Sequence, residues 1–260
     1  MTAPLLQLSG VVRRYRLPRD SLLRRGPVLT AVEDVSFALH AGETLGIVGE
    51  SGSGKSTLAR LVMAFEPPDA GTVRFEGQDL NALAPSALRR MRPRFQMVFQ
   101  DPFGSLDPRR TAGWSIAEPL RVMGAARVGA RVAEALEQVG LRPGDAGRYP
   151  HEFSGGQRQR IAIARAIVTR PRLLVADEAV SALDVSVQAQ ILNLLMDLQE
   201  EMGLGLIFIS HDLAVVACIA DRLLVLQGGR EVEAGPTARL LAAPRQDYTR
   251  TLLAAAGIDP

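Results

Sequence analysis

Lysine is nearly absent from this chain, which has one lysine, Lys55, among 30 basic side chains. A single ammonium among guanidinium groups indicates a position where a compact cation is needed and a planar one does not fit. Cysteine is equally scarce. Because Cys218 stands alone, the sequence excludes an internal disulfide and a multi-cysteine zinc or iron–sulfur site. Cys218 lies in the apolar run 213–220, so we expect it to fill space in the core.

Long apolar runs and a strong excess of one charge are also missing. No stretch approaches the roughly 18–20 apolar residues that cross a bilayer, and the N-terminus lacks the basic and apolar regions of a secretory signal. We therefore expect a cytoplasmic chain. A net charge of +2 is too small to argue for a nucleic-acid partner, and we expect none. The 260 residues, 47% of them hydrophobic, are enough to bury a sizeable core.

The stretch 49–56 reads Gly-Glu-Ser-Gly-Ser-Gly-Lys-Ser and fits the phosphate-binding pattern G-x-x-x-x-G-K-[ST]. An apolar strand, 44–48, precedes it and a helix, 57–63, follows it, which is the context that this motif requires. Glycines let backbone N–H groups turn inward around phosphate oxygens, and the helix N-terminus adds partial positive charge. We expect Lys55 to reach the β- and γ-phosphates and the Ser56 hydroxyl to bind Mg²⁺. The nucleotide-binding residues predicted here are Gly49, Glu50, Ser51, Gly52, Ser53, Gly54, Lys55, Ser56 and Thr57.

The remaining hydrophobic patterns predict an α/β protein with an inserted helical part. Residues 101–168 have mostly helical patterns, including a helix that Gly140 ends. An amphipathic helix spans 187–202, with Gly203 as its stop. The polar and basic residues 16–30 are interpreted as a solvated loop in preference to a lipid- or partner-binding segment. An antiparallel N-terminal sheet is expected to contain the strands 6–12, 32–39 and 71–77. A second, largely parallel sheet is expected to contain the strand before the phosphate loop together with 173–176, 206–209 and 223–226.

Two acids follow the apolar strand 173–176. Asp177 is at its carboxyl end, where open α/β sheets bind ligands, and can hold the Mg²⁺ that Ser56 binds. Glu178 is placed to polarise and orient a water that attacks the γ-phosphate. His211 follows the strand 206–209 and can reach the same phosphate. We therefore predict Glu178 and His211 as catalytic residues.

Four further motifs resemble those of the ABC-type ATPases. The stretch 153–157, Phe-Ser-Gly-Gly-Gln, is similar to the signature motif of that family, and 99–102, Phe-Gln-Asp-Pro, is similar to its Q-loop. The stretch 181–184, Ser-Ala-Leu-Asp, matches the D-loop, and 210–212, Ser-His-Asp, matches the switch histidine. With the phosphate loop, these motifs occur in the order of the family, and the resemblance covers essentially the whole chain.

The resemblance implies the ABC ATPase fold: one domain, 1–260, with an N-terminal antiparallel β-subdomain, a P-loop (RecA-like) α/β core and an α-helical subdomain. We assign 1–100 and 169–260 to the first two and 101–168 to the helical subdomain. ATP and Mg²⁺ are the implied cofactors, with Ser56, Gln100 and Asp177 as the metal-binding residues. Tyr15, which ends the first strand, is the expected adenine-stacking aromatic in preference to Phe37. The further cofactor-binding residues implied are Gln100, Ser154, Gly155, Gly156, Gln157 and Asp177.

The resemblance also implies partners. The residues Ser154 to Gly156 open a helix whose free N–H groups form a second phosphate cradle. In the family, a head-to-tail ATPase dimer holds each ATP between the phosphate loop of one chain and the signature of the other. Whether the partner is an identical chain or a second ABC subunit stays open.

Four stretches narrow the resemblance to importers of oligopeptides, dipeptides and nickel, namely 99–109, 149–160, 184–190 and 247–253. This group implies an ATP-hydrolysing subunit on the cytoplasmic face of the inner membrane. Its partners would be two transmembrane permease subunits, contacted through the loop 100–109, and indirectly an extracytoplasmic solute-binding protein. The cargo stays open. The alternative is an ABC ATPase of a soluble complex, such as one that degrades phosphonates.

Overall fold

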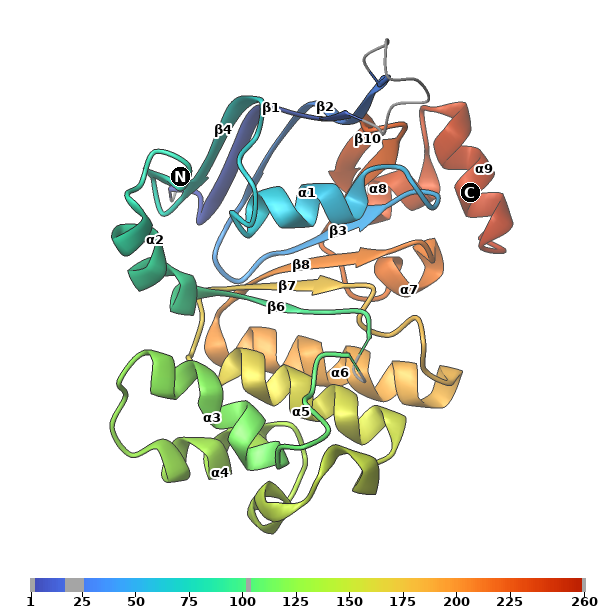
Figure 1. Ribbon diagram of the computed structural model, residues 1–260. Coiled ribbons are helices and arrows are strands. Elements are labelled where there is room, and N and C mark those ends of the chain that lie inside the picture. Colours follow the sequence, from blue (N-terminus) through green and yellow to red (C-terminus); the bar gives the residue numbers. More distant parts are fainter. Residues whose placement is uncertain (1–2, 17–25, 102–103, 259–260) are drawn as a thin grey trace. The chain divides into compact units, whose positions relative to one another are not determined.

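The computed structural model describes residues 3–16, 26–101 and 104–258, and Figure 1 labels its helices and strands. The chain forms two compact units. The first unit consists of Met1–Ala84 and Phe208–Pro260, and the second is Pro85–Ile207. Each unit is described by itself below. The subdomain boundaries expected from the sequence, at 100/101 and 168/169, stay a prediction.

An antiparallel sheet forms the N-terminal part of the first unit. Its strand order is β2-β1-β4-β5, with β1 at Leu6–Arg16, β2 at Val28–Leu39, β4 at Ala70–Phe75 and β5 at Gln78–Asp79. Alternate β1 residues such as Leu6 and Leu8 are buried, as expected for a sheet with one covered face. Strand β2 begins at Val28, so the prediction of a loop through residue 30 was wrong at that end; residues 17–25 lie outside the described part of the chain.

A second group of strands in the first unit carries the phosphate loop. Strand β3, Thr44–Val48, pairs in parallel with β9, Arg222–Gln227, and β9 pairs antiparallel with β10, Arg230–Pro236. Every residue of β3 is buried, which explains its uninterrupted apolar sequence. The helices of this unit are α1 at Lys55–Val62, α7 at Leu213–Ala217, α8 at Thr237–Ala242 and α9 at Asp247–Ala255. The sequence patterns did not predict β10, α8 or α9.

The second unit combines two parallel strands with packed helices. Strand β6, Phe95–Val98, pairs with β7, Leu173–Asp177. Helix α3 packs against α4 and α5, and α5 packs against α6 (Figure 1). The α-helices are α2 at Pro85–Met91, α3 at Ala112–Val122, α4 at Val128–Gln138, α5 at Gly155–Ile167 and α6 at Val185–Met202, and short 3₁₀ helices lie at Arg92–Arg94, Pro143–Gly147 and Pro150–Glu152. Strand β8, Gly205–Ser210, leads the chain from the second unit into the first.

The ends of two helices follow the predicted signals. Gly203 ends α6 in the left-handed region at φ 59°, and Gly140, at φ 72°, follows the end of α4. Glycine adopts this conformation without the Cβ penalty that other residues have. The predicted stops of both helices are therefore confirmed.

Cys218 does not fill space in the core. It is exposed, because the run 213–220 is helical at its start and presents its residues to different sides. Leu213 and Val216, three positions apart on α7, are the buried ones, and Cys218 follows the end of this short helix on the solvent side. In the part of the chain that the structure describes, no helix has the length and apolar character needed to cross a membrane.

Candidate functional site

The loop between β3 and α1 is folded around the Lys55 side chain. Lys55 Nζ donates hydrogen bonds to the carbonyl oxygens of Gly49 and Glu50, at 2.7 and 2.8 Å, and the residue is only 4% exposed. Burying an ammonium group is costly unless hydrogen bonds replace the water that it loses. The loop therefore encloses the only lysine of the chain and holds it with its own backbone.

Two glycines allow this loop to lie close to neighbouring strands. A Cβ on Gly49 would lie 2.2 Å from the carbonyl oxygen of Leu226 in β9, and one on Gly54 would lie 2.3 Å from that of Ala31 in β2. Gly54 also has φ 102°, a backbone conformation that side chains disfavour. Any larger residue at these two positions would push the loop away from the sheets that support it.

Ser53 places an unsatisfied polar atom inside the loop. The residue is 4% exposed, and its Oγ has no hydrogen-bond partner among the described residues. Leaving a buried hydroxyl unpaired costs about 1–3 kcal/mol. The backbone of Ser53 is well held, because its N–H donates to Glu50 O at 3.1 Å and its carbonyl accepts from Gly229 N at 3.0 Å. A buried ammonium, an unpaired hydroxyl and a helix N-terminus together fit a bound triphosphate.

The Tyr15 side chain is held through its hydroxyl group and by a cation against one face of its ring. Its hydroxyl donates a 2.7 Å hydrogen bond to Glu66, and the Arg13 guanidinium lies 4.9 Å from the ring centroid. Burial alone would raise the pKa of Glu66, but the bonds from Tyr15 and Arg60 and the nearby charge of Arg13 lower it. The carboxylate thus stays charged and anchors the ring. Phe37 is buried, as the preference for Tyr15 assumed.

His211 lies in an ordered turn of the first unit. It is exposed and follows the last residue of β8. The next residue, Asp212, caps helix α7 by accepting hydrogen bonds from the N–H groups of Ala214 and Val215, at 2.9 and 3.2 Å. The Asp212 N–H donates to Ser210 Oγ at 3.0 Å. The backbone on both sides of His211 is therefore fixed by local hydrogen bonds.

In the second unit, the carboxyl ends of β6 and β7 bring Gln100 and Glu178 together. Gln100 Nε2 donates to Glu178 Oε2 at 3.0 Å, and the Ser181 hydroxyl lies 3.3 Å from the same amide and donates to Glu178 O at 3.0 Å. Asp177 is the last residue of β7, as predicted. Glu178 has φ 48°, a conformation that costs a non-glycine residue energy and is concentrated at functional sites.

The signature stretch forms the beginning of helix α5. Ser154 is its N-cap: Ser154 Oγ accepts from Gln157 N at 3.3 Å, and Gln157 Oε1 accepts from Ser154 N at 3.0 Å. This reciprocal pair is a capping box. A Cβ on Gly156 would lie 2.5 Å from Val187 Cγ1, whereas one on Gly155 would lie 3.7 Å from Leu183. Gly156 thus allows the start of α5 to pack against the start of α6.

The predicted site residues are divided between the two units. Tyr15, the residues 49–57 and His211 belong to the first, and Gln100, 154–157, Asp177 and Glu178 belong to the second. Sequence reasoning missed two residues that contact this set. Glu66 anchors Tyr15, and Tyr248 contacts Glu50. Of these two residues, only Tyr248 lies in a stretch, 247–253, that carried the resemblance to the importer group.

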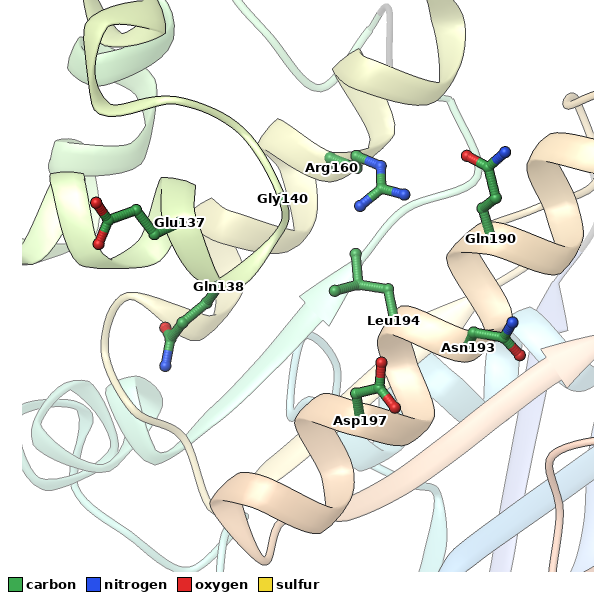
Figure 2. Close-up of a pocket in the computed structure, with 8 residues that line it drawn as sticks. All are labelled: Glu137, Gln138, Gly140, Arg160, Gln190, Asn193, Leu194 and Asp197. Atoms are coloured by element: carbon green, nitrogen blue, oxygen red, sulfur yellow. The ribbon is translucent and has the colours of Figure 1, made fainter.

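A pocket of about 400 Å³ lies elsewhere in the second unit. Figure 2 shows its lining side chains on α4, α5 and α6, among them Glu137, Arg160 and Asp197. The Arg160 guanidinium donates a 2.6 Å hydrogen bond to the carbonyl oxygen of Val139, so part of its hydrogen-bonding capacity is satisfied by the protein backbone. None of the lining residues is a predicted site residue. The full lining is Glu137, Gln138, Gly140, Arg160, Gln190, Asn193, Leu194 and Asp197.

Comparison with known proteins identifies similar chains. The sequence model of the family described as "ABC transporter" matches residues 32–181. The "Probable peptide ABC transporter ATP-binding protein y4tS" of Sinorhizobium fredii is 53% identical over 264 residues, covering 100% of this chain and 75% of the relative. The "Glutathione import ATP-binding protein GsiA" of Salmonella paratyphi A is 51% identical over 261 residues, 99% of this chain. The chain spans 42% of the length of that relative.

Solved structures have the same fold. A dimeric ATP-binding cassette in a post-hydrolysis state bound to ADP and Pi superposes with a TM-score of 0.77 and 29% identity, covering 89% of this chain and 98% of that one. CbiO1 from Clostridium perfringens, part of an ABC transporter complex, superposes with a TM-score of 0.80, covering 92% and 91%. Its identity of 24% shows likeness of fold alone. The predicted mixed α/β cassette fold is confirmed.

Proposed function

This chain belongs to the ABC transporter family, and we propose that it is the ATP-binding and ATP-hydrolysing subunit of an importer. The observation that carries this proposal is the phosphate loop, in which a buried Lys55 is held beside an unpaired Ser53 hydroxyl. Such a loop has a desolvated cation and donors ready for phosphate oxygens.

The residues of each unit have distinct roles in the proposed reaction. Lys55 and the backbone of the loop bind the β- and γ-phosphates, and Tyr15 stacks on the adenine. Glu178 accepts a hydrogen bond from the water that attacks the γ-phosphate, and Gln100 holds the Glu178 carboxylate at 3.0 Å. His211 contacts the γ-phosphate.

Magnesium binding is proposed for oxygen atoms of the chain, because hydroxyl, amide and carboxylate oxygens are the ligands that Mg²⁺ prefers. The Ser56 hydroxyl, the Gln100 side-chain carbonyl and the Asp177 carboxylate would hold it. When bound, Mg²⁺ neutralises charge on the phosphate groups.

We also propose an ATPase dimer, with this chain either as both subunits or paired with a second ABC subunit. The N-terminus of α5 supports this, because Ser154 is exposed and the N–H groups of a first helical turn point away from the carbonyl oxygens of the helix, with that of Gln157 bonded to the Ser154 hydroxyl. The signature of one chain would bind the ATP that the phosphate loop of the other holds. Closure of the dimer around ATP would be the step that energises transport.

The cargo class we propose is peptides, with nickel as the alternative within the same group. The names of two relatives, one for peptides and one for glutathione, support peptides. The partners would be two transmembrane permease subunits and, indirectly, an extracytoplasmic solute-binding protein. The chain would bind peripherally at the cytoplasmic face of the inner membrane, with the loop 100–109 toward the permease.

A pair of substitutions tests the enzymatic part of this proposal. Glu178→Gln should keep ATP binding and slow hydrolysis by about 10²-fold or more, the scale of a lost general base. Lys55→Ala should abolish ATP binding. Glu201→Gln, on the exposed surface of α6, is the matched control for the first change. Near-normal turnover of Glu178→Gln in the assembled complex would remove this residue from its role.

A pull-down from detergent-solubilised cells tests the importer role. Two multi-spanning proteins and a solute-binding protein are the expected partners, and the ligand of the binding protein would identify the cargo. Recovery of soluble enzymes alone would contradict import and favour the alternative of a soluble phosphonate-degrading complex.

A further inference from the structure

One peptide group of the phosphate loop is held from both sides. The carbonyl oxygen of Gly49 accepts a 2.7 Å hydrogen bond from Lys55 Nζ. The N–H of Glu50, in the same peptide group, donates a 3.2 Å hydrogen bond to the hydroxyl of Tyr248. The C=O and N–H of a trans peptide point in opposite directions. Lys55 therefore bonds this group from inside the loop and Tyr248 bonds it from outside.

This arrangement couples Tyr248 to the position of the Lys55 ammonium. A rotation of the Gly49–Glu50 peptide group would break both hydrogen bonds at once, because the group is planar and rigid. Gly49 has φ 155°, and as a glycine it resists such a rotation less than any other residue would. The loop holds this peptide group through Lys55 Nζ on its carbonyl oxygen, and Tyr248 adds a contact to its N–H from outside the loop.

Helix α9, which carries Tyr248, is itself fixed to the first unit. The carboxylate of Glu233 in β10 accepts hydrogen bonds from the backbone N–H groups of Arg245 and Gln246, at 3.0 and 3.2 Å, where the helix begins. Glu233 and Leu253 are buried, and α9 packs against α7 and β10. Tyr248 is thus presented to the loop by a rigid support.

Helix α9 also lies against the helix that follows His211. Asp212 caps α7, and α7 packs against α9 within the same unit. One C-terminal helix thus contacts the phosphate loop through Tyr248 and the helix next to the switch histidine. The stretch 247–253, which resembles the importer group but had no assigned role, forms this helix.

We propose that Tyr248 is a positioning residue of the nucleotide site, whose hydroxyl fixes the Gly49–Glu50 peptide group and through it the Lys55 ammonium. This proposal rests on the proposed phosphate-binding role of the loop. With Lys55 proposed to contact phosphate already in the bound substrate, we expect its displacement to weaken binding of the substrate as well as of the transition state. Loss of the Tyr248 hydroxyl therefore acts on KM for ATP rather than on kcat.

The test is the variant Tyr248→Phe, which keeps the ring and removes the hydroxyl. We expect KM for ATP to rise roughly threefold to tenfold, the range given by one hydrogen bond, while kcat stays within about twofold, as uniform binding requires. In the full-length protein without nucleotide, amide hydrogen exchange at Glu50 should accelerate by about fivefold or more, because its N–H loses its acceptor. The side-chain NMR signal of isotope-labelled Lys55, the only lysine in the chain, should shift.

Two controls distinguish a positioning role of Tyr248 from a merely structural one. Thr251→Val lies on the same helix and removes a hydroxyl that donates to Asp247 O at 3.0 Å, so it should change neither KM nor exchange at Glu50. The amide of buried Leu253 reports on α9 itself, and its exchange should not change in Tyr248→Phe. Faster exchange at Leu253 as well would mean that the helix has come loose, and would overturn the proposal.

The remaining outcomes would contradict the proposed role of Tyr248 or the proposed function of the loop. Unchanged exchange at Glu50 and an unchanged Lys55 signal in Tyr248→Phe would show that the hydroxyl does not position the loop. Faster exchange at Glu50 with unaltered KM would show a contact without a role in nucleotide binding. If Lys55→Ala binds ATP as well as the wild type, the proposed function of the loop fails, whatever the exchange data show, and the two failures are thus distinguishable.

Discussion

The side-chain amide of Gln100 donates a 3.0 Å hydrogen bond to the carboxylate of Glu178. The two residues are 78 positions apart and follow neighbouring parallel strands, β6 and β7. Glu178 also has a left-handed backbone conformation, at φ 48°. A carboxylate with a fixed direction is what a general base needs in order to orient a water molecule.

Removing the Gln100 amide should slow hydrolysis. For Gln100→Ala we expect kcat for ATP, at saturating Mg²⁺, to fall by about tenfold or more, since hydrogen bonds to charged groups are worth roughly 1.5–3 kcal/mol. Steady-state kinetics of the assembled complex measure this. Gln96→Ala is the matched control, because the Gln96 amide donates to the carbonyl oxygen of Arg92 at 2.7 Å instead. Equal losses in the two variants would contradict the role of Gln100.

The aromatic ring of Tyr15 should matter more than its hydroxyl. Stacking on a base is worth about 1–3 kcal/mol, so Tyr15→Ala should raise KM for ATP by about fivefold to 150-fold. Tyr15→Phe loses only the bond to Glu66 and should raise it by about threefold or less. Inhibition by inorganic triphosphate, which has no base, serves as the control and should be unchanged in both. A weaker triphosphate inhibition would show that Tyr15 acts on the phosphate loop instead.

The two signature glycines should tolerate a methyl group differently. Gly156→Ala places a Cβ 2.5 Å from Val187 Cγ1 and should lower the free energy of unfolding by about 1–3 kcal/mol, as overpacking does. Gly155→Ala, with 3.7 Å to Leu183, should be near neutral. Thermal denaturation measures both.

The clash at Gly156 can be tested by relieving it. The double variant Gly156→Ala with Val187→Ala should be more stable than the sum of the single effects, because the two residues are in contact. Additive losses would show that the start of α5 does not pack against Val187 as the structure has it.

The Glu233 carboxylate should stabilise the fold in a pH-dependent manner. Burial alone would raise the pKa of Glu233, but hydrogen bonds from the backbone N–H groups of Arg245 and Gln246 and the nearby charge of Arg239 outweigh it, so the pKa is lowered. A group with a lowered folded-state pKa stabilises the protein above its unfolded pKa, about 4.3 for glutamate. That stabilisation is lost as the pH falls through the folded-state pKa.

Denaturation of wild type and Glu233→Gln at several pH values measures this effect. We expect the variant to be less stable at pH 7 and the difference to shrink as the pH falls below the usual range of glutamate. Glu201→Gln, on the exposed face of α6, should show no such difference. A difference for Glu233→Gln that is independent of pH would mean that the ionised carboxylate is not what caps α9.

The sequence by itself determined the features that rest on neighbours a few residues apart. The phosphate loop, the fully buried strand β3 before it, the start of α5 at Ser154 and the Gly203 stop of α6 could all be predicted, because their hydrogen bonds and backbone conformations are local. The order of the motifs then indicated the fold, which structural neighbours share.

Only the tertiary structure decided which distant residues meet. Tyr248 and Glu50 are 198 positions apart, and nothing local specifies that a tyrosine hydroxyl should reach the N–H of a loop. The exposure of Cys218 depends on which side of a short helix faces the core, which an uninterrupted apolar run does not indicate. Such contacts arise from the packing of whole elements, and this packing depends on side-chain shape along the entire chain.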